Sequence, residues 1–376
     1  KSEKFTGPVL MVAASDTSPG LRYVTPCGTH DPIVCMQWGR RRWLIVSTME
    51  KNRALRADPA ARVMTPDMVQ GKREKKRNVS GWALGLLRKL RVRSVTVAAD
   101  FPIGVARELE QGGIRVGVAR GGLFPRRAIK TARELRSIAE AQRAAVAGVK
   151  TAVVLLRAAR IGRGGILHHG GKPLTAEHVR RAIHRTLLDH DCFGTDTIVA
   201  GGAQGADPHC AGAGPLRAGQ PIVLDIFPRS FTTGYWGDIT RTVIKGATPS
   251  EWRRMLAGVR AAQAKALACL RPGARCGDVH AAAAAELERR GYKFRIIRGR
   301  PAGFIHGTGH GVGLEIHEAP YLGHGQAVRL KPGNVVTVEP GLYYPGRGGV
   351  RIEDLVVVTR RGWRCLATCP TLIRIP

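Results

Sequence analysis

The sequence lacks any stretch that resembles a membrane-spanning helix. None of its apolar runs reaches the roughly 18 consecutive residues that a helical span requires. No secretory signal is visible, because residues 1–7 are polar and residues 8–14 are too short an apolar run and lack a cleavage pattern. We therefore expect a cytoplasmic protein without a membrane partner.

Paired cysteine motifs are also missing. The chain of 376 residues has eight cysteines, none of them in a C-x-x-C pair and none clustered: Cys27, Cys35, Cys192, Cys210, Cys269, Cys276, Cys365 and Cys369. This scatter is typical of reduced thiols in a chain of this length, and it argues against a disulfide framework.

Acidic residues are scarce, with 28 against 60 basic residues and a formal net charge of +32. Such an excess is compatible with a nucleic acid partner. However, the basic residues are spread over the whole chain, and dense runs occur only at 40–42 and 72–77. Arginine also outnumbers lysine beside abundant alanine and glycine, a bias that GC-rich coding produces without any partner. We therefore regard nucleic acid binding as possible but do not expect it.

The length of the chain favours two domains, since single cores rarely grow beyond about 250–300 residues. Residues 1–127 alternate short strands and helices and predict a small α/β domain. Strands are expected at 9–14, 33–37, 43–47, 94–98 and 115–119, and helices at 49–56, Val79–Lys89 and Ile103–Gln111.

A long helical pattern at 130–158 opens the predicted second domain, residues 128–376. The glycine-rich stretch 160–173 is expected to be a loop, and Thr175 is placed to cap a helix at 176–189. Further helices are expected at 249–270 and 277–290, between strands and glycine-rich turns. No internal repeat is visible at the 20–50-residue periods of solenoid proteins.

Two aspartates stand in or beside strand-like runs, Asp225 in VLDIF and Asp238 in GDITRT. A hairpin turn containing Pro228 and Gly237 would bring them to one end of a sheet. Aspartate is disfavoured inside strands, and a buried unpaired carboxylate is costly. A divalent cation would offset both penalties, although a turn or a salt bridge explains this pair equally well.

Three histidines lie within twelve residues among four glycines, His306, His310 and His317 in HGTGHGVGLEIH. Glycine allows the backbone to approach a ligand closely, and imidazole binds first-row transition metals and transfers protons near neutral pH. The segment therefore predicts a metal or catalytic site. The alternative is a glycine-rich loop with solvent-exposed histidines.

Two glutamates, Glu339 and Glu353, end or enter apolar strand runs and therefore need partners. Arg351 competes as a partner for Glu353, so a structural ion pair is the alternative for that segment. Taken together, four carboxylates and one imidazole suit two divalent cations about 3.5–4 Å apart, which activate a bridging water and polarise a carbonyl. This ligand set is compatible with Mn²⁺, Co²⁺, Zn²⁺ or Fe²⁺.

In order and type, these motifs resemble the pita-bread metallopeptidases, which include methionine aminopeptidase, aminopeptidase P and prolidase. The resemblance covers about residues 128–370. The N-terminal part, with Tyr23 and residues 43–53, resembles the creatinase-type N-domain of the proline-specific members. The resemblance implies a creatinase-like α/β domain at 1–127, followed by a pita-bread catalytic domain at 128–376.

The resemblance also implies roles for particular residues. Asp225 would chelate one metal, His310 and Glu339 the other, and Asp238 and Glu353 would bridge both; Glu339 would also take a proton from the bridging water. Substrate-contacting roles fall on residues around the ligands: His209 at the amide or leaving group, His306 and His317 lining the pocket and stabilising the oxyanion, and Arg351 contacting substrate or orienting Glu353. Thr240 would orient Asp238.

One departure from the family concerns the two aspartates, which are 238 − 225 = 13 positions apart. The family spacing is shorter by two, and the extra residues here are Pro228-Arg229. A hairpin tip tolerates an insertion, and an even number keeps side chains facing the same way along a strand.

The resemblance implies an Xaa-Pro aminopeptidase or dipeptidase that uses two metal ions, with Mn²⁺ favoured, and acts through a metal-bridging hydroxide on peptides with proline at the second position. A homodimer is also implied. Two other hypotheses stay open. One is a metal-dependent enzyme acting on another small molecule. The other is a scaffold that has lost catalysis and binds nucleic acid or protein, which the charge of +32 favours and the intact ligand set opposes.

Overall fold

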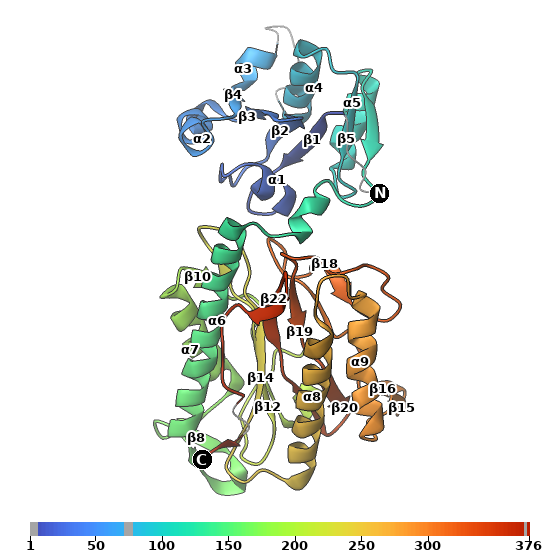
Figure 1. The fold of residues 1–376 in the computed structure, drawn as a ribbon. Helices are drawn as coiled ribbons and strands as arrows, with labels where there is room; N and C mark the ends of the chain where they lie inside the picture. Colours follow the sequence, from blue (N-terminus) through green and yellow to red (C-terminus); the bar gives the residue numbers. More distant parts are fainter. Residues whose placement is uncertain (1–6, 71–77, 372–373) are drawn as a thin grey trace. The chain divides into compact units, whose positions relative to one another are not determined.

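The computed structural model describes residues 7–70, 78–371 and 374–376. The chain divides into two compact units, Lys1–Arg127 and Ala128–Pro376 (Figure 1). The basic run at 72–77 lies outside the described residues.

The first unit is built on a six-stranded mixed sheet in the order β4-β3-β2-β1-β5-β6. β1 pairs antiparallel with β2, which pairs antiparallel with β3, whereas β1/β5, β3/β4 and β5/β6 are parallel pairs. The strands are β1 Val9–Ala13, β2 Ile33–Trp38, β3 Arg41–Ile45, β4 Arg62–Met64, β5 Ser94–Val97 and β6 Arg115–Val118.

Helices cover both faces of this sheet, because alternate residues of a strand point to opposite sides. Leu10 and Val12 of β1 pack in a core with α4 (Val79–Lys89) and α5 (Ile103–Gln111). Val9 and Met11 pack in a second core with α1 (Pro19–Val24) and α2 (Lys51–Ala57). The short α3 (Pro66–Val69) precedes α4. The predicted α/β fold of this part is therefore confirmed.

The expected elements of the first unit agree closely with the structure. Helices α4 and α5 have the expected bounds, and the five expected strands are present with ends shifted by one or two residues. Among the described residues, the helices α1 and α3 and the strand β4 were missed. Each spans six residues or fewer, which is too short for hydrophobic periodicity to be recognised.

The described part of the second unit has four longer helices: α6 Ala132–Ala158, α7 Ala176–Leu188, α8 Ser250–Cys269 and α9 Cys276–Arg289. A capping box starts α6, in which Thr131 accepts from the Glu134 backbone and the Glu134 side chain accepts from the Thr131 backbone. As expected, the Thr175 side chain caps α7 by accepting from the His178 backbone at 3.3 Å.

Two sheets occupy the middle of this unit. One has the order β11-β12-β14-β24 and the other the order β18-β17-β19-β22-β23. Their strands are β11 Ile198–Gly201, β12 Ile222–Ile226, β14 Ile239–Lys245 and β24 Arg374–Ile375, then β17 Gly309–Gly311, β18 Glu318–Leu322, β19 Val335–Val338, β22 Asp354–Thr359 and β23 Gly362–Cys365.

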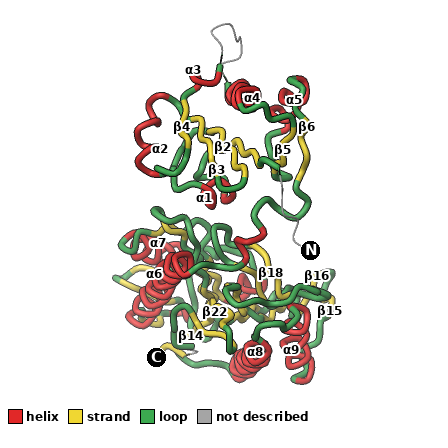
Figure 2. Tube along the Cα trace, turned by 45° about the horizontal axis from the view of Figure 1, so that its top comes forward, coloured by secondary structure: helices red, strands yellow, loops and turns green. Residues whose placement is uncertain are grey.

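Each sheet carries its own helix pair. The helices α6 and α7 share a core with β11, β12 and β14. The helices α8 and α9 share a second core with β19, β22 and the hairpin β20–β21 (Gly341–Tyr344 and Gly348–Arg351). Figures 1 and 2 show α6 and α7 on one side of the strands and α8 and α9 on the other. The strands between the two pairs carry the candidate site.

The prediction of a loop at 160–173 is wrong. It forms a three-stranded sheet of β7 Arg160–Ile161, β8 Leu167–His169 and β9 Lys172–Pro173, with a 3-10 turn, η3, at Arg163–Gly165. Leu167 is fully buried in the core that α6 and α7 share with β11, β12 and β14, and it anchors this sheet. Glycine-rich sequence concealed these strands of two or three residues.

The connection between Asp225 and Asp238 is longer than a simple hairpin. It contains β13 Arg229–Ser230, which pairs with β10 Cys192–Phe193 and also forms an antiparallel bridge to Trp236 within the connection itself. The extra Pro228-Arg229 therefore leads into a strand that is held by another part of the unit. Smaller elements complete the fold: the 3-10 turns η1 Thr48–Glu50, η2 Pro125–Ala128 and η4 Gly202–Ala206, and the hairpin β15 Arg295–Ile297 with β16 Arg300–Ala302.

Among the described residues, none of the helices has the length and apolar character that crossing a membrane requires. All eight cysteines are free thiols, as expected. Burial raises the pKa of the Cys35 thiol to about 12.

The buried thiol of Cys35 predicts a loss of stability in alkaline solution. Its folded-state pKa lies above the unfolded value of about 8.5. The protonated Cys35 thiol therefore contributes its full share to the free energy of unfolding below a pH of about 8.5. This share is lost as the pH rises toward 12. Calorimetry should show a smaller fall in Tm between about pH 8 and pH 10.5 for Cys35→Ala than for the wild type. Cys210→Ala, at a half-buried position, should keep the wild-type slope; equal slopes for all three proteins would contradict the prediction.

Candidate metal centre

The predicted metal ligands come from strands of both central sheets. In the antiparallel pair of β12 and β14, Asp225 lies opposite Thr240, and Asp238 directly precedes β14. The second sheet joins the first at this point, because the backbone N–H of Glu353 donates to the Thr240 carbonyl at 3.0 Å. The backbone N–H of Glu339 donates to the Thr308 carbonyl at 2.8 Å. These contacts bring residues far apart in sequence to one place.

Three side chains form a compact cluster of metal-ligating atoms. One ligand atom each from Asp238, His310 and Glu353 lies within 4.8 Å of the others. The His310 Nε2 atom lies 3.4 Å from Glu339 Oε1 and 3.7 Å from Asp238 Oδ2. Oxygen atoms with one imidazole nitrogen at this spacing fit a first-row divalent cation.

Asp225 completes the acidic cluster. It is buried, and one of its oxygens, Oδ2, accepts a hydrogen bond from Arg351 Nη2 at 2.6 Å. Its other oxygen, Oδ1, is buried and has no hydrogen-bond partner among the described residues. A buried carboxylate oxygen without a donor is costly, and a cation is the partner that would satisfy it. The residues present therefore fit a metal centre.

The electrostatics of the cluster support the same conclusion. Burial, followed by the charges of Glu353, Asp225 and Glu339, raises the pKa of Asp238 well above its usual value. Burial also raises the pKa of Glu353 well above its usual value, with Glu339 and Asp225 adding to the effect, and it raises the pKa of Glu339 to about 7. Burial lowers the pKa of His310 to about 3, so the imidazole is neutral, as a ligand must be.

Further histidines surround the cluster. The rings of His310 and His317 meet edge to face with centroids 4.2 Å apart. His306 Nε2 lies 2.9 Å from the Tyr343 hydroxyl, and burial lowers the pKa of His306 to about 4. His209 is exposed. The pKa of His317 is lowered first by the burial of His317 itself and next by the electrostatic influence of His209. The structure thus brings all the predicted substrate-contacting histidines to the rim of the cluster.

One alternative and one expected contact are wrong. The alternative of a structural ion pair between Arg351 and Glu353 does not hold, because Arg351 binds Asp225 and donates to the Tyr343 hydroxyl at 2.8 Å. Thr240 does not hold Asp238; its hydroxyl donates to Glu353 Oε2 at 2.8 Å and accepts from Arg351 Nε at 3.1 Å. Arg351 therefore acts on Glu353 only through Thr240. The pairing of sheets, which motifs do not reveal, decides these partners.

The sequence reasoning missed Tyr343, Gln142 and Gln263. Tyr343 is fully buried and joins His306 to Arg351 through its hydroxyl. The two buried glutamines bond to backbone beside the candidate ligands. A polar residue inside an otherwise apolar helix face was the available signal for the glutamines, because buried amides require partners.

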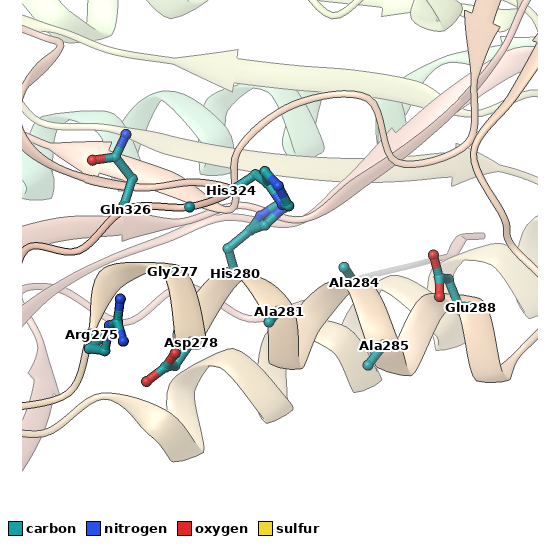
Figure 3. Close-up of a pocket in the computed structure, with 11 residues that line it drawn as sticks. Arg275, Gly277, Asp278, His280, Ala281, Ala284, Ala285, Glu288, His324 and Gln326 are labelled. Atoms are coloured by element: carbon teal, nitrogen blue, oxygen red, sulfur yellow. The ribbon is translucent and has the colours of Figure 1, made fainter.

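A separate cavity of about 440 Å³ lies between α9 and the loop at 324–326, and it contains none of the predicted site residues. Figure 3 shows His280 and His324 next to each other, with Arg275 and Gln326 on one side of them and Glu288 farther along α9 on the other. His280 Nδ1 lies 3.0 Å from the Thr308 hydroxyl, next to the segment that carries His306 and His310. The cavity is therefore distinct from the acidic cluster.

Comparison with known proteins identifies the family. The model of metallopeptidase family M24 matches residues 136–360. The chain belongs to this family of pita-bread metallopeptidases, and the resemblance inferred from the motifs is confirmed.

Individual relatives support the assignment. A probable dipeptidase PepE of Mycobacterium tuberculosis is 39% identical over 181 residues, which are 48% of this chain and 46% of the relative. An Xaa-Pro dipeptidase of Pyrococcus furiosus is 38% identical over 168 residues, 44% of this chain and 45% of the relative. The chain thus spans about half the length of the curated relatives it matches.

A solved structure extends the likeness of fold to the whole chain. The X-Pro aminopeptidase of Thermotoga maritima superimposes with a TM-score of 0.82 over 98% of both chains, at 22% sequence identity. This confirms the expected pita-bread fold preceded by an N-terminal α/β domain.

The clustering of carboxylates predicts that metal-free protein gains stability when one charge is removed. Asp238→Asn keeps the shape of the side chain but removes its repulsion with Glu353, Asp225 and Glu339. At about pH 8, the metal-free variant should melt at a higher temperature than metal-free wild type. The gap should shrink at about pH 5, because protonation of these carboxyls then relieves the wild type.

Divalent metal should reverse the order. It should raise the Tm of the wild type by selective binding to the folded state and leave that of Asp238→Asn nearly unchanged. Thermal unfolding with EDTA and with added Mn²⁺ provides the comparison. A metal-free variant less stable than metal-free wild type at pH 8 would show that the carboxylates do not repel one another as described.

Proposed function

We propose that this protein is a two-metal-dependent peptidase that cleaves the bond before proline, as an Xaa-Pro aminopeptidase or Xaa-Pro dipeptidase. The observation that carries the proposal is the convergence of Asp238, His310 and Glu353 within 4.8 Å, beside Glu339 and Asp225, in a chain of the M24 family. The relative named Xaa-Pro dipeptidase supports the choice of substrate.

In this proposal, Asp225 and its neighbours hold two divalent cations. Asp225 would bind metal through Oδ1, since Oδ2 is occupied by Arg351. His310 and Glu339 would bind the second ion, and Asp238 and Glu353 would bridge. Four carboxylates and one imidazole suit Mn²⁺, Co²⁺, Zn²⁺ or Fe²⁺, and the family resemblance favours Mn²⁺ among them. When bound, the cations supply the Lewis acidity that polarises the scissile carbonyl and activates water.

The protein's own side chains carry the remaining steps. Glu339 takes the proton from the attacking water and passes it toward the leaving proline nitrogen. His317 and His306 line the substrate side, and His317 donates to the developing oxyanion. His306 lines the pocket through its ring, because its Nδ1 already contacts the Gly307 carbonyl at 2.6 Å and its Nε2 the Tyr343 hydroxyl at 2.9 Å. His209, exposed at the rim, contacts the peptide amide. Arg351 holds Asp225 in place and keeps Tyr343 oriented toward His306.

Further features of the proposal come from the family. The unit Lys1–Arg127 would be a creatinase-type N-domain and Ala128–Pro376 the catalytic domain. The substrate would be a peptide with proline at the second position. A homodimer and a cytoplasmic location stay predictions, and sedimentation analysis of the purified protein measures the first.

Activity on defined peptides tests the proposed function. Protein loaded with Mn²⁺ or Co²⁺ should release alanine from Ala-Pro or from Ala-Pro-Ala, but not from Ala-Ala-Ala. Asp238→Ala removes a bridging carboxylate and should reduce this activity by at least about 10³-fold, the scale expected when an essential electrostatic group is lost. Product release is measured by chromatography.

A matched control separates loss of the site from loss of folding. Asp278→Ala changes an exposed aspartate outside the acidic cluster, in the separate cavity, and should keep full activity. Absence of cleavage of every Xaa-Pro and N-terminal-Met peptide by protein shown to contain two metal ions would contradict the peptidase proposal.

A further inference from the structure

Two buried glutamines have no part in the proposed chemistry. Gln142 of α6 is 0% exposed and Gln263 of α8 is 7% exposed. Each directly follows a fully buried alanine, Ala141 or Ala262, on the helix face that packs on the central strands. Burying a primary amide is costly unless its donors and acceptor are bonded. The bonds made by these amides therefore indicate why polar side chains occupy core positions.

Gln142 bonds to both backbone groups of a single residue, Asp238. Its Nε2 donates to the Asp238 carbonyl at 2.8 Å, and its Oε1 accepts from the Asp238 N–H at 2.6 Å. The preceding Gly237 lies directly against the helix, because a Cβ there would come within 2.5 Å of the Ala141 carbonyl carbon. The helix α6 thus fixes the position and the orientation of the Asp238 backbone, which carries a candidate bridging carboxylate.

Gln263 performs a similar task on the other sheet. Its Nε2 donates to the Val338 carbonyl at 3.1 Å and to Asp354 Oδ2 at 3.0 Å, with the Ile352 carbonyl at 3.5 Å. Val338 precedes Glu339, and Ile352 and Asp354 flank Glu353. One amide therefore ties together the backbone beside two candidate ligands on separate strands.

We propose that Gln142 and Gln263 are positioning residues that hold the carboxylates of Asp238, Glu339 and Glu353 in metal-binding geometry. The proposal rests on the proposed metal centre. Like-charged carboxylates repel, so without restraint their backbones would relax apart. A metal site requires its ligands to be held within about 0.5 Å of productive geometry by rigid elements. Each glutamine connects ligand-bearing backbone to the middle of a long helix, α6 or α8.

The contacts predict a specific effect on metal binding. Replacing Gln142 or Gln263 by methionine keeps a similar length and volume but removes the amide. The Asp238 N–H and carbonyl, or the Val338 carbonyl, then lose their partner. Loss of groups that orient metal ligands reduces metal affinity by about 10–100-fold. We expect a weakening of this size for Co²⁺ in each variant.

Co²⁺ is the probe, because its visible absorption reports coordination geometry independently of catalysis. Metal-free full-length wild type, Gln142→Met and Gln263→Met are each titrated with Co²⁺, and affinity and absorption spectrum are recorded. Circular dichroism and thermal unfolding verify that each variant is folded. The two glutamines act on different strands, so either variant tests the proposal if the other fails to fold.

Two controls distinguish positioning from general loosening. Gln204 makes the same two-bond contact with a backbone that carries no candidate ligand, donating to the Ala213 carbonyl at 2.9 Å and accepting from its N–H at 2.8 Å. Lys245 joins the far end of β14 to α6 through the Arg157 carbonyl at 2.9 Å. It lies 245 − 238 = 7 positions from Asp238, about 23 Å along a strand. Gln204→Met and Lys245→Met should retain wild-type Co²⁺ affinity and spectrum.

The outcomes separate the positioning role from the metal centre itself. Weaker Co²⁺ binding with an altered spectrum in the Gln142 and Gln263 variants, but not in the controls, supports the proposal. Folded Gln142→Met and Gln263→Met proteins with wild-type affinity and spectrum would overturn it, as would an equal loss in Lys245→Met. Wild-type protein that binds no Co²⁺ would refute the proposed metal centre, and the positioning role with it.

Discussion

The site is dominated by the repulsion among four carboxylates, three of them buried and the fourth, Glu339, half-buried. Asp225, Asp238, Glu339 and Glu353 gather on the strands between two helix pairs, and burial raises the pKa of the last three. A buried cluster of like charges is unfavourable unless cations neutralise it. The fold therefore has to hold these side chains together against their mutual electrostatic repulsion. Divalent metal ions would neutralise the cluster.

The surrounding residues oppose this repulsion in distinct ways. Arg351 supplies one positive charge to Asp225 and reaches Glu353 through the Thr240 hydroxyl. The chain Arg351–Tyr343–His306 extends this network to the proposed substrate side. Gln142 and Gln263 act on the backbone instead, and bind it to α6 and α8. An ion pair, hydrogen bonds and helix packing thus all stabilise the positions of the same four carboxylates.

The sequence allowed some features to be predicted and not others, for a physical reason. The bounds of α4 and α5 follow from local periodicity and end signals, so they were predictable. The candidate ligands could be named because each stands in its own short motif. The partners of Arg351 and Thr240 could not, because they depend on how two sheets meet. Gln142 lies 96 positions from the residue it holds, beyond the reach of any local pattern.

The central claim is that this acidic cluster binds two metal ions side by side. Anomalous diffraction from crystals of the Co²⁺-loaded protein, recorded at the cobalt absorption edge, tests it most directly. The account predicts two peaks about 3.5–4 Å apart, one against Asp225 Oδ1 and one against His310 Nε2, with Asp238 and Glu353 between them. A single peak, or peaks elsewhere with none among these carboxylates, would contradict it.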